Sequence, residues 1–124
     1  MASYVAGQPV VSRGEVWWVR TIVASGEGKQ VAENKPFLVL QDNRRARDVR
    51  WPTVLAVRIT SNITRDRETH VTLGGNEGLS GVVQCETLEA VPRWRFRSRI
   101  CAVQPGTMKR VEAVVKTVLG MEEV

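Results

Sequence analysis

Histidine, cysteine and clustered acidic residues are scarce in this chain of 124 residues. A single histidine, His70, excludes acid–base catalysis by a pair of histidines. With two cysteines and that one histidine widely spaced, a structural zinc site is not expected, and the scattered acidic residues do not predict a carboxylate-held metal site. Cys85 and Cys101 lie in apolar stretches, which favours reduced packing residues over a disulfide or a catalytic pair. His70 lies in a strand-like segment and is interpreted as a structural or surface residue.

Long hydrophobic runs are also absent. No stretch approaches the 18 apolar residues of a membrane-spanning helix. The N-terminus lacks a basic segment followed by an apolar one, so it does not resemble a signal peptide, and a cytoplasmic protein without membrane attachment is expected. The length suits one domain, predicted at residues 12–124, with residues 1–11 predicted as a loosely attached tail.

Arginine, in contrast, is abundant. The chain has 18 basic and 13 acidic residues, a net charge of +5, and 14 of the basic residues are arginine. The planar guanidinium group suits phosphate and stacks on nucleobases. The charge is therefore compatible with a polyanionic partner or with a solvated cationic surface, and charge alone does not decide between them.

Short strand-like segments precede a single helix. Apolar alternation and β-branched residues predict strands at residues 13–20, 37–40, 53–60, 69–73, 82–88 and 97–103. Residues 24–34, with two glycines and few apolar side chains, predict a long mobile loop, and residues 42–51 predict an exposed connection. Apolar residues at every third or fourth position after Pro105 predict an amphipathic helix ending at Gly120. The fold class is mostly β with a C-terminal α-helix, a small and strongly bent antiparallel sheet or barrel.

A second alternation is found near the last predicted strand. Arginines at positions 93, 95, 97 and 99 alternate with Trp94 and Phe96. On a strand, this pattern would place the arginines on one face and the two aromatic rings on the other. The aromatic rings are predicted to fill the core.

Four ordered blocks carry a resemblance to a known family. They are RGEVWWV at 13–19, KPFLVL at 35–40, PTVLAVRITSN at 52–62 and GLSGVVQ at 78–84. Their order and spacing, over residues 12–120, resemble the MazF/PemK-type toxins, small endoribonucleases of toxin–antitoxin pairs. The resemblance implies an SH3-like antiparallel β-barrel of the CcdB/MazF/PemK type, typically a homodimer. It also implies single-stranded RNA as substrate and a cognate antitoxin protein as partner.

The resemblance implies where the chemistry would lie. The family has a basic residue, usually Arg, before the Pro that opens its second strand, and a Thr at the end of its third strand. These positions align with Lys35 and Thr60. RNA is cleaved when its 2′-OH attacks the adjacent phosphorus, and a cation and a hydroxyl group that stabilise the pentacovalent dianion need no metal. Lys35 and Thr60 are therefore expected to be the catalytic residues of a metal-independent, sequence-selective endoribonuclease (an mRNA interferase) without a cofactor.

RNA-binding residues are expected beside this pair and in the arginine-rich connections. They are Ser25, Lys29, Gln30, Asn34, Ser61, Asn62, Arg44, Arg45, Arg65 and Arg67. Two features depart from the family pattern: a lysine at position 35, which lacks the planar fork of arginine, and the loop SGEGKQ at 25–30 in place of a Gly-Ser-Glu-Gln-like motif. Two alternatives stay open. One is a CcdB-like gyrase poison that hydrolyses nothing, and the other is a catalytically silent RNA-binding or antitoxin-binding homologue.

Overall fold

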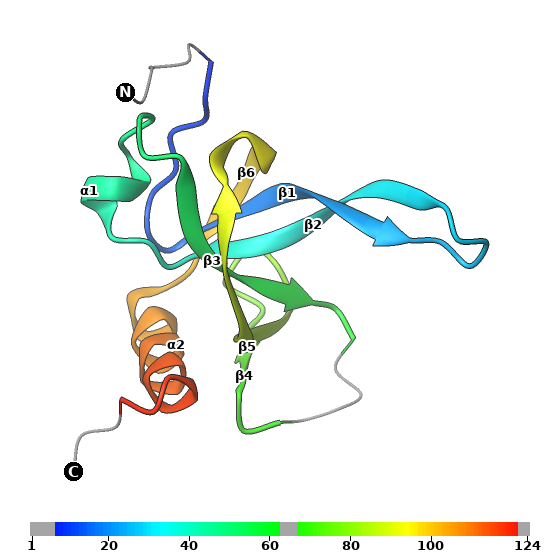
Figure 1. The fold of residues 1–124 in the computed structure, drawn as a ribbon. Helices are drawn as coiled ribbons and strands as arrows, with labels where there is room; N and C mark the ends of the chain where they lie inside the picture. Colours follow the sequence, from blue (N-terminus) through cyan, green and yellow to red (C-terminus); the bar gives the residue numbers. More distant parts are fainter. Residues whose placement is uncertain (1–6, 63–66, 122–124) are drawn as a thin grey trace.

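The computed structural model describes residues 7–62 and 67–121 and contains a bent six-stranded sheet with a C-terminal helix (Figure 1). Adjacent strands are antiparallel, in the order β4-β5-β3-β2-β1-β6. The predicted fold class is confirmed. The elements are β1 (Glu15–Ala24), β2 (Gln30–Val39), α1 (Asn43–Ala46), β3 (Thr53–Thr60), β4 (His70–Leu73), β5 (Gly81–Pro92), the 3-10 turn η1 (Arg93–Arg95), β6 (Phe96–Ala102) and α2 (Pro105–Val118).

The sheet bends enough to bury both faces of the last three residues of β2. Leu38 packs in one core cluster with Val57 of β3 and Val111 of α2. Its neighbours Phe37 and Val39 face the opposite way and pack in a second cluster with residues of β1, β3 and β5. Because side chains alternate along a strand, a continuous apolar run such as residues 37–40 needs cover on both faces, and the bend provides it.

Helix α2 is held in place at its N-terminus by a buried carboxylate. Glu77, in the connection between β4 and β5, is 5% exposed and accepts hydrogen bonds from the backbone N–H of Gln104, at 2.7 Å, and from the hydroxyl group of Thr107. A negative charge is favourable at a helix N-terminus because the first N–H groups have no partner within the helix. Pro105 begins the helix and Gly120, at φ +71°, follows its end, as the sequence predicted.

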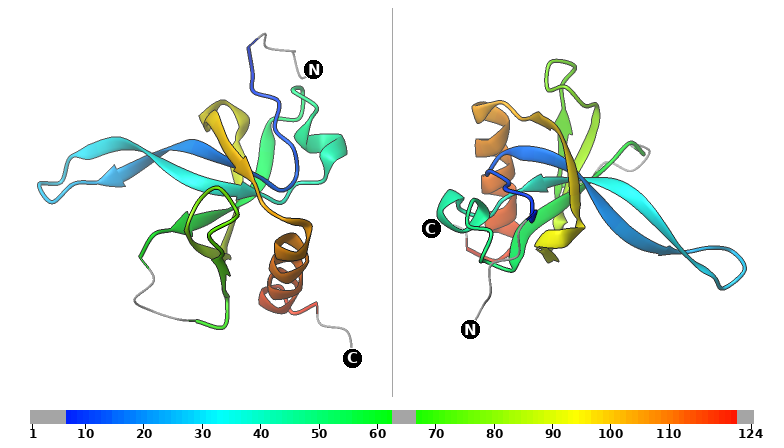
Figure 2. Two further views of the ribbon diagram at one scale, coloured as in Figure 1. Left: turned by 180° about the vertical axis from the view of Figure 1, so that it is seen from behind. Right: turned by 90° about the horizontal axis from the view of Figure 1, so that it is seen from above.

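The predicted mobile loop at residues 24–34 is wrong. Strands β1 and β2 pair without interruption from Val16–Leu38 to Ala24–Gln30 and form a hairpin that projects from the body of the molecule (Figure 2). The connection is a short turn in which the N–H of Ser25 donates to the carbonyl group of Lys29 at 2.7 Å. The order of this segment comes from cross-strand hydrogen bonds, which local composition does not reveal.

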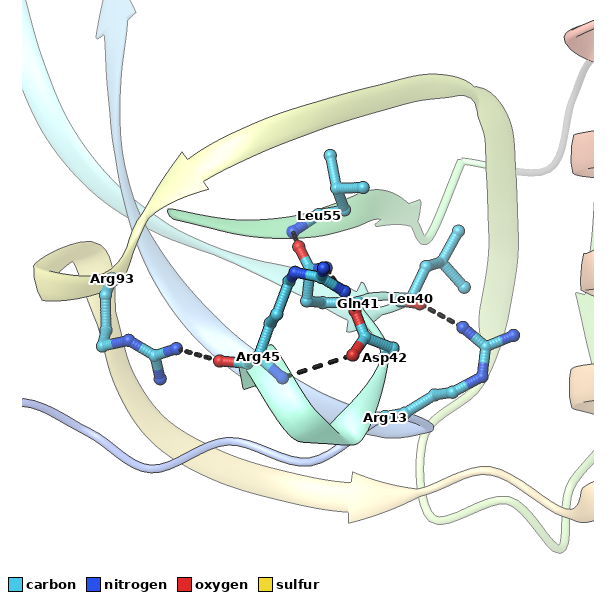
Figure 3. Close-up of polar contacts among 7 residues, drawn as sticks. All are labelled: Arg13, Leu40, Gln41, Asp42, Arg45, Leu55 and Arg93. Carbon is cyan, nitrogen blue, oxygen red and sulfur yellow. Dashed lines mark hydrogen bonds and ion pairs between the residues drawn. The ribbon is translucent and has the colours of Figure 1, made fainter. Parts of the chain in front are cut away.

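The predicted alternation of arginines and aromatic rings at 93–99 is only partly correct. Residues 93–95 form η1, which breaks the period of two, so Trp94 is 55% exposed while Arg93 is 2% exposed. Phe96 is buried, as predicted. Arg93 donates to the backbone carbonyl groups of four residues, and Figure 3 shows it pointing toward one of them, on α1. The four acceptors are Pro9, Arg45, Ala46 and Trp51.

Two other segments are more ordered than expected. Val11, in the range predicted as a loose tail, is fully buried in the second core cluster, so this residue belongs to the folded domain. The connection at 42–51 contains α1, and Ala46 of this helix is also fully buried. No helix in the described parts of the chain is long and apolar enough to cross a membrane.

Candidate active site

A pocket of about 300 Å³ opens between β2, the end of β3 and the segment before β5. Four residues predicted to contact RNA or act in catalysis line this pocket together: Asn34 and Lys35 on β2, Thr60 at the end of β3, and Ser61 directly after it. The remaining lining residues are Trp18, Pro36, Ile59, Leu79 and Ser80. Residues more than 20 positions apart in the sequence are thus brought into one cavity.

The pocket exists because β2 and β3 stop pairing at Pro36. The two strands pair at Phe37–Arg58, and the same register would next place Pro36 opposite Ile59. Proline has no N–H group to extend the ladder. From this point β3 continues its pairing with β5 alone, through Thr60 and Val82. The separation leaves space between the Lys35 end of one strand and the Thr60 end of the other.

The opposite wall depends on Gly81. This residue has φ +143°, and a Cβ atom there would lie 2.7 Å from the carbonyl oxygen of Thr60. A contact this short excludes any side chain without a backbone shift. Gly81 therefore allows β5 to approach β3 closely, and this brings Leu79 and Ser80 to the pocket wall. The second glycine of the block GLSGVVQ is therefore required for the close approach of β5 to β3.

Lys35 supplies the positive charge in the pocket. Its Nζ atom lies 3.0 Å from Oε2 of Glu33, and the two side chains are 46% and 48% exposed. An ion pair with this exposure contributes about 0–1 kcal/mol. A phosphate group entering the pocket can therefore compete with Glu33 for the ammonium group.

Thr60 supplies an oriented hydroxyl group. Its Oγ1 atom accepts a hydrogen bond from the backbone N–H of Asn62 at 3.1 Å. No acceptor for the Thr60 hydroxyl proton is found in residues 7–62 and 67–121, so this proton is free to be donated to a ligand. The pocket thus offers one cation and the hydroxyl group of Thr60, with the hydroxyl groups of Ser61 and Ser80 beside it, which suits an anionic group with several oxygen atoms.

Other predicted RNA-binding residues lie outside the pocket. Ser25 and Lys29 form the hairpin turn, and Gln30 begins β2, about 16 Å from Lys35 at the usual rise per residue of a strand. Arg44 and Arg45 lie on α1, beyond the far end of β3.

Arg45 is engaged locally, since its guanidinium group lies 3.1 Å from the carboxylate of Asp42 and 5.1 Å from the ring centroid of Trp51. Arg67 is exposed just before β4, and Asn62 follows Ser61 on the surface. Arg65 lies outside the described residues. The structure therefore groups Asn34, Lys35, Thr60 and Ser61, and leaves the α1 arginines and the hairpin turn at separate places.

Sequence reasoning missed Trp18 as a pocket residue. The block RGEVWWV has two adjacent tryptophans, and successive side chains of a strand point to opposite faces. Trp17 packs edge-on against Phe96, with ring centroids 6.3 Å apart, while Trp18 lines the pocket and is 37% exposed. The adjacent pair was the available signal, because both rings could not enter the same core.

His70 and the cysteines lie away from the pocket. The Nε2 atom of His70 is 3.4 Å from a carboxylate oxygen of Glu86, on β5. Both cysteines are free, as predicted, and burial raises the pKa of the Cys85 thiol to about 11 and also raises the pKa of the Cys101 thiol. A thiol that stays protonated at neutral pH is a poor nucleophile. No group of three or more potential metal ligands is found in the described residues.

Comparisons with known proteins agree on one family. The sequence model described as "PemK-like, MazF-like toxin of type II toxin-antitoxin system" matches residues 12–119. The endoribonuclease MazF1 of Mycobacterium bovis is 30% identical over 87 residues, which cover 70% of this chain and 80% of the relative. A mycobacterial endoribonuclease solved with its cognate antitoxin has a TM-score of 0.75 at 25% identity and covers 92% of this chain and 99% of its own. A MazE–MazF structure from Deinococcus radiodurans has a TM-score of 0.77 at 21% identity, with the same coverage.

Proposed function

Because the chain belongs to the PemK-like, MazF-like toxin family of type II toxin–antitoxin systems, we propose that it cleaves single-stranded RNA in the pocket that holds Lys35 and Thr60. One observation carries the assignment. A cation and a hydroxyl donor, 25 positions apart in sequence, line the same cavity, between strands that separate at Pro36. The relatives' names support the reaction type, since MazF1 of Mycobacterium bovis is named an endoribonuclease.

The proposed reaction is a transfer within the RNA itself. The 2′-hydroxyl group of the nucleotide before the cut gives its proton to solvent water as its oxygen bonds to the adjacent phosphorus, and the bond from phosphorus to the 5′-oxygen breaks as that oxygen takes up a proton. The products are a 2′,3′-cyclic phosphate and a free 5′-hydroxyl. The protein's task is to position the backbone and to stabilise the dianion between these states, which is a matter of placed charges and hydrogen-bond donors.

Lys35 and Thr60 have complementary roles in this scheme. The ammonium group of Lys35 exchanges Glu33 for the phosphate oxygens and is a proton donor for the leaving 5′-oxygen. The Thr60 hydroxyl, oriented by the N–H of Asn62, donates its proton to a second phosphate oxygen. Asn34 and Ser61 offer further polar contacts beside them. No step requires a metal ion.

The substrate is proposed to be single-stranded because the bases must reach the pocket wall. A cavity of about 300 Å³ accommodates one nucleotide unit, not a paired duplex. Sequence-selective proteins recognise unpaired bases by splaying them out of the stack, where their edges are accessible. This chain is accordingly proposed to select its cut sites through bases bound beside Lys35 and Thr60.

The proposed partner is a cognate antitoxin, and the proposed working form is a cytoplasmic homodimer. A related endoribonuclease has been solved with its antitoxin. The net charge of +5 favours an acidic antitoxin segment, which would compete with RNA for the cationic pocket. Homodimerisation is supported by an apolar groove of about 300 Å³ between α2 and β3, lined by Leu55, Val115 and Leu119. Mass measurement in solution tests the dimer.

The test of the reaction compares purified native protein with Lys35→Ala and Lys109→Ala. Lys109 is an exposed lysine of α2 outside the pocket, and its substitution controls for a general loss of charge. Each protein is incubated with a long single-stranded RNA in excess EDTA, and the ends of the fragments are mapped. We expect discrete cuts with 5′-hydroxyl ends for native protein and Lys109→Ala, and a rate lower by about 10²–10³ for Lys35→Ala, because removal of a transition-state charge partner has an effect of this size.

Two outcomes would contradict the proposal. Undiminished cleavage by Lys35→Ala would remove Lys35 from the chemistry. No cleavage by native protein would favour the alternatives without RNA cleavage, a gyrase poison or a catalytically silent homologue. Lys35→Arg should keep phosphate binding, since it preserves the charge and adds a planar fork, but it should cleave more slowly, because a guanidinium group is a poor proton donor for the leaving oxygen.

A further inference from the structure

One face of the β1–β2 hairpin, opposite to the face that carries the side chain of Lys35, continues the pocket past Pro36 toward the hairpin turn. Trp18 lies opposite Pro36 and Arg20 lies opposite Asn34 in the hairpin register. Alternate residues of a strand share a face, and Trp18, Pro36 and Asn34 line the pocket. Arg20 therefore lies on the same face, one step farther along the hairpin that projects in Figure 2.

Trp18 keeps exposed surface, as Trp51 and Trp94 do, but among these three tryptophans it alone lines the pocket. It is 37% exposed at the pocket, although its neighbour Trp17 packs against Phe96. The indole N–H of Trp18 has no acceptor within residues 7–62 and 67–121, whereas that of Trp17 donates to Glu15 at 3.2 Å. Trp18 thus presents apolar surface and a free donor to whatever occupies the pocket.

Arg20 is a free cation beside this ring. Its side chain is exposed, and no carboxylate of the described residues lies within ion-pair distance of it. Five other arginines are paired with carboxylates: Arg13, Arg45, Arg50, Arg58 and Arg99. Along a strand, Arg20 lies about 7 Å from Trp18. An aromatic ring followed by an unpaired guanidinium group is the arrangement by which proteins hold single-stranded nucleic acid, through base stacking and phosphate contact.

We propose that Trp18 is the stacking platform for the base next to the scissile phosphate, and that Arg20 binds the following phosphate. The inference rests on the proposed function and adds the subsite that sets the position of the strand in the pocket. Stacking accepts every base, so Trp18 supplies affinity and register. Base selectivity is left to edge contacts, for which Asn34, opposite Arg20, offers an amide donor and acceptor.

The first test measures binding without cleavage. A fluorescent single-stranded oligonucleotide whose 2′-hydroxyl groups are replaced by hydrogen keeps its bases and phosphates but has no nucleophile. We expect Trp18→Ala to bind it about 5- to 100-fold more weakly, and Trp18→Phe to retain most of the affinity, since the effect of removing a stacked base partner is of this size. Trp94→Ala is the matched control, because Trp94 is 55% exposed and outside the pocket, and its affinity should not change.

An abasic scan locates the stacked base. An abasic site is introduced at each position in turn, and we expect one position to weaken binding to native protein. In Trp18→Ala the same abasic site should have no further effect, because the ring it would stack on is already gone. An unchanged abasic profile in Trp18→Ala would overturn the proposal.

Arg20→Gln gives a second measurement that leaves Trp18 packing intact. Removal of one phosphate contact should reduce the slope of log affinity against log salt by about 0.7. Arg110→Gln, on α2, is the control for net charge and should leave the slope unchanged. An unchanged slope for Arg20→Gln would refute the phosphate contact.

Cleavage of unmodified RNA by the native protein is measured in a separate assay. Cleavage with binding independent of Trp18 overturns the subsite alone. Binding that depends on Trp18 without any cleavage overturns the endoribonuclease assignment alone. Absence of both binding and cleavage overturns both.

Discussion

Replacing Arg93 by lysine should destabilise the fold more than any other arginine substitution in the described chain. Arg93 is 2% exposed and donates to four backbone carbonyl groups at 2.7–3.0 Å. These acceptors lie before β1, on α1 and before β3, so one side chain ties three segments to the end of β5. Burial lowers the pKa of Arg93, yet a guanidinium group stays charged at neutral pH.

The magnitude follows from the geometry of the four hydrogen bonds. Lysine keeps the charge, but its donors share one nitrogen atom and cannot reach acceptors spread around a planar fork. At least two bonds should be lost, each worth about 1.5–3 kcal/mol when the donor is charged. We expect a loss of about 3–6 kcal/mol in the free energy of unfolding, a large part of the 5–15 kcal/mol typical of a domain. For a chain of this size, that lowers Tm by about 10–20 °C.

Urea and thermal unfolding of purified Arg93→Lys, followed by circular dichroism, check this value. Arg97→Lys is the matched control, since Arg97 is exposed on β6 and its substitution should change stability by less than about 0.5 kcal/mol. A loss below about 1 kcal/mol for Arg93→Lys would show that the four bonds are replaced by water or by other donors, and would refute the reasoning.

Three further substitutions test the pocket and its supports. Gly81→Ala should lower the free energy of unfolding by about 1–3 kcal/mol and reduce RNA cleavage, because its Cβ would lie 2.7 Å from the Thr60 carbonyl oxygen at a φ of +143°; unfolding and cleavage rates measure both effects. Glu33→Gln should tighten binding of an uncleavable oligonucleotide by up to about fivefold, since it releases the pocket lysine from an ion pair of about 0–1 kcal/mol; unchanged or weaker binding in titrations would contradict this. Glu77→Gln should destabilise the protein by about 1–3 kcal/mol in urea unfolding, because a charged acceptor at the start of α2 becomes neutral; an effect below about 0.5 kcal/mol would show that the negative charge does not stabilise the start of the helix.

Local sequence determined those strands and helices whose own residues favour one backbone conformation. The β-branched run at Thr53–Thr60 was predicted as a strand with these ends, because its side chains favour the extended backbone regardless of what they pack against. The helix after Pro105 was predicted from its own period, with a proline at its start and a glycine after its end. The residue before Pro36 and the last residue of the third strand were selected by resemblance, and the structure places both in one pocket.

Only the tertiary structure decided what depends on partners distant in the sequence. Residues 24–34 are ordered because each strand of the hairpin satisfies the backbone groups of the other, and neither strand carries that information alone. Arg93 is buried because carbonyl groups from three other segments meet at its guanidinium group. The alternation of arginines with aromatic residues in the sequence had suggested a surface cation instead. Trp18 belongs to the pocket, and the α1 arginines do not, because strand separation at Pro36 opens space at one end of β3 and not at the other.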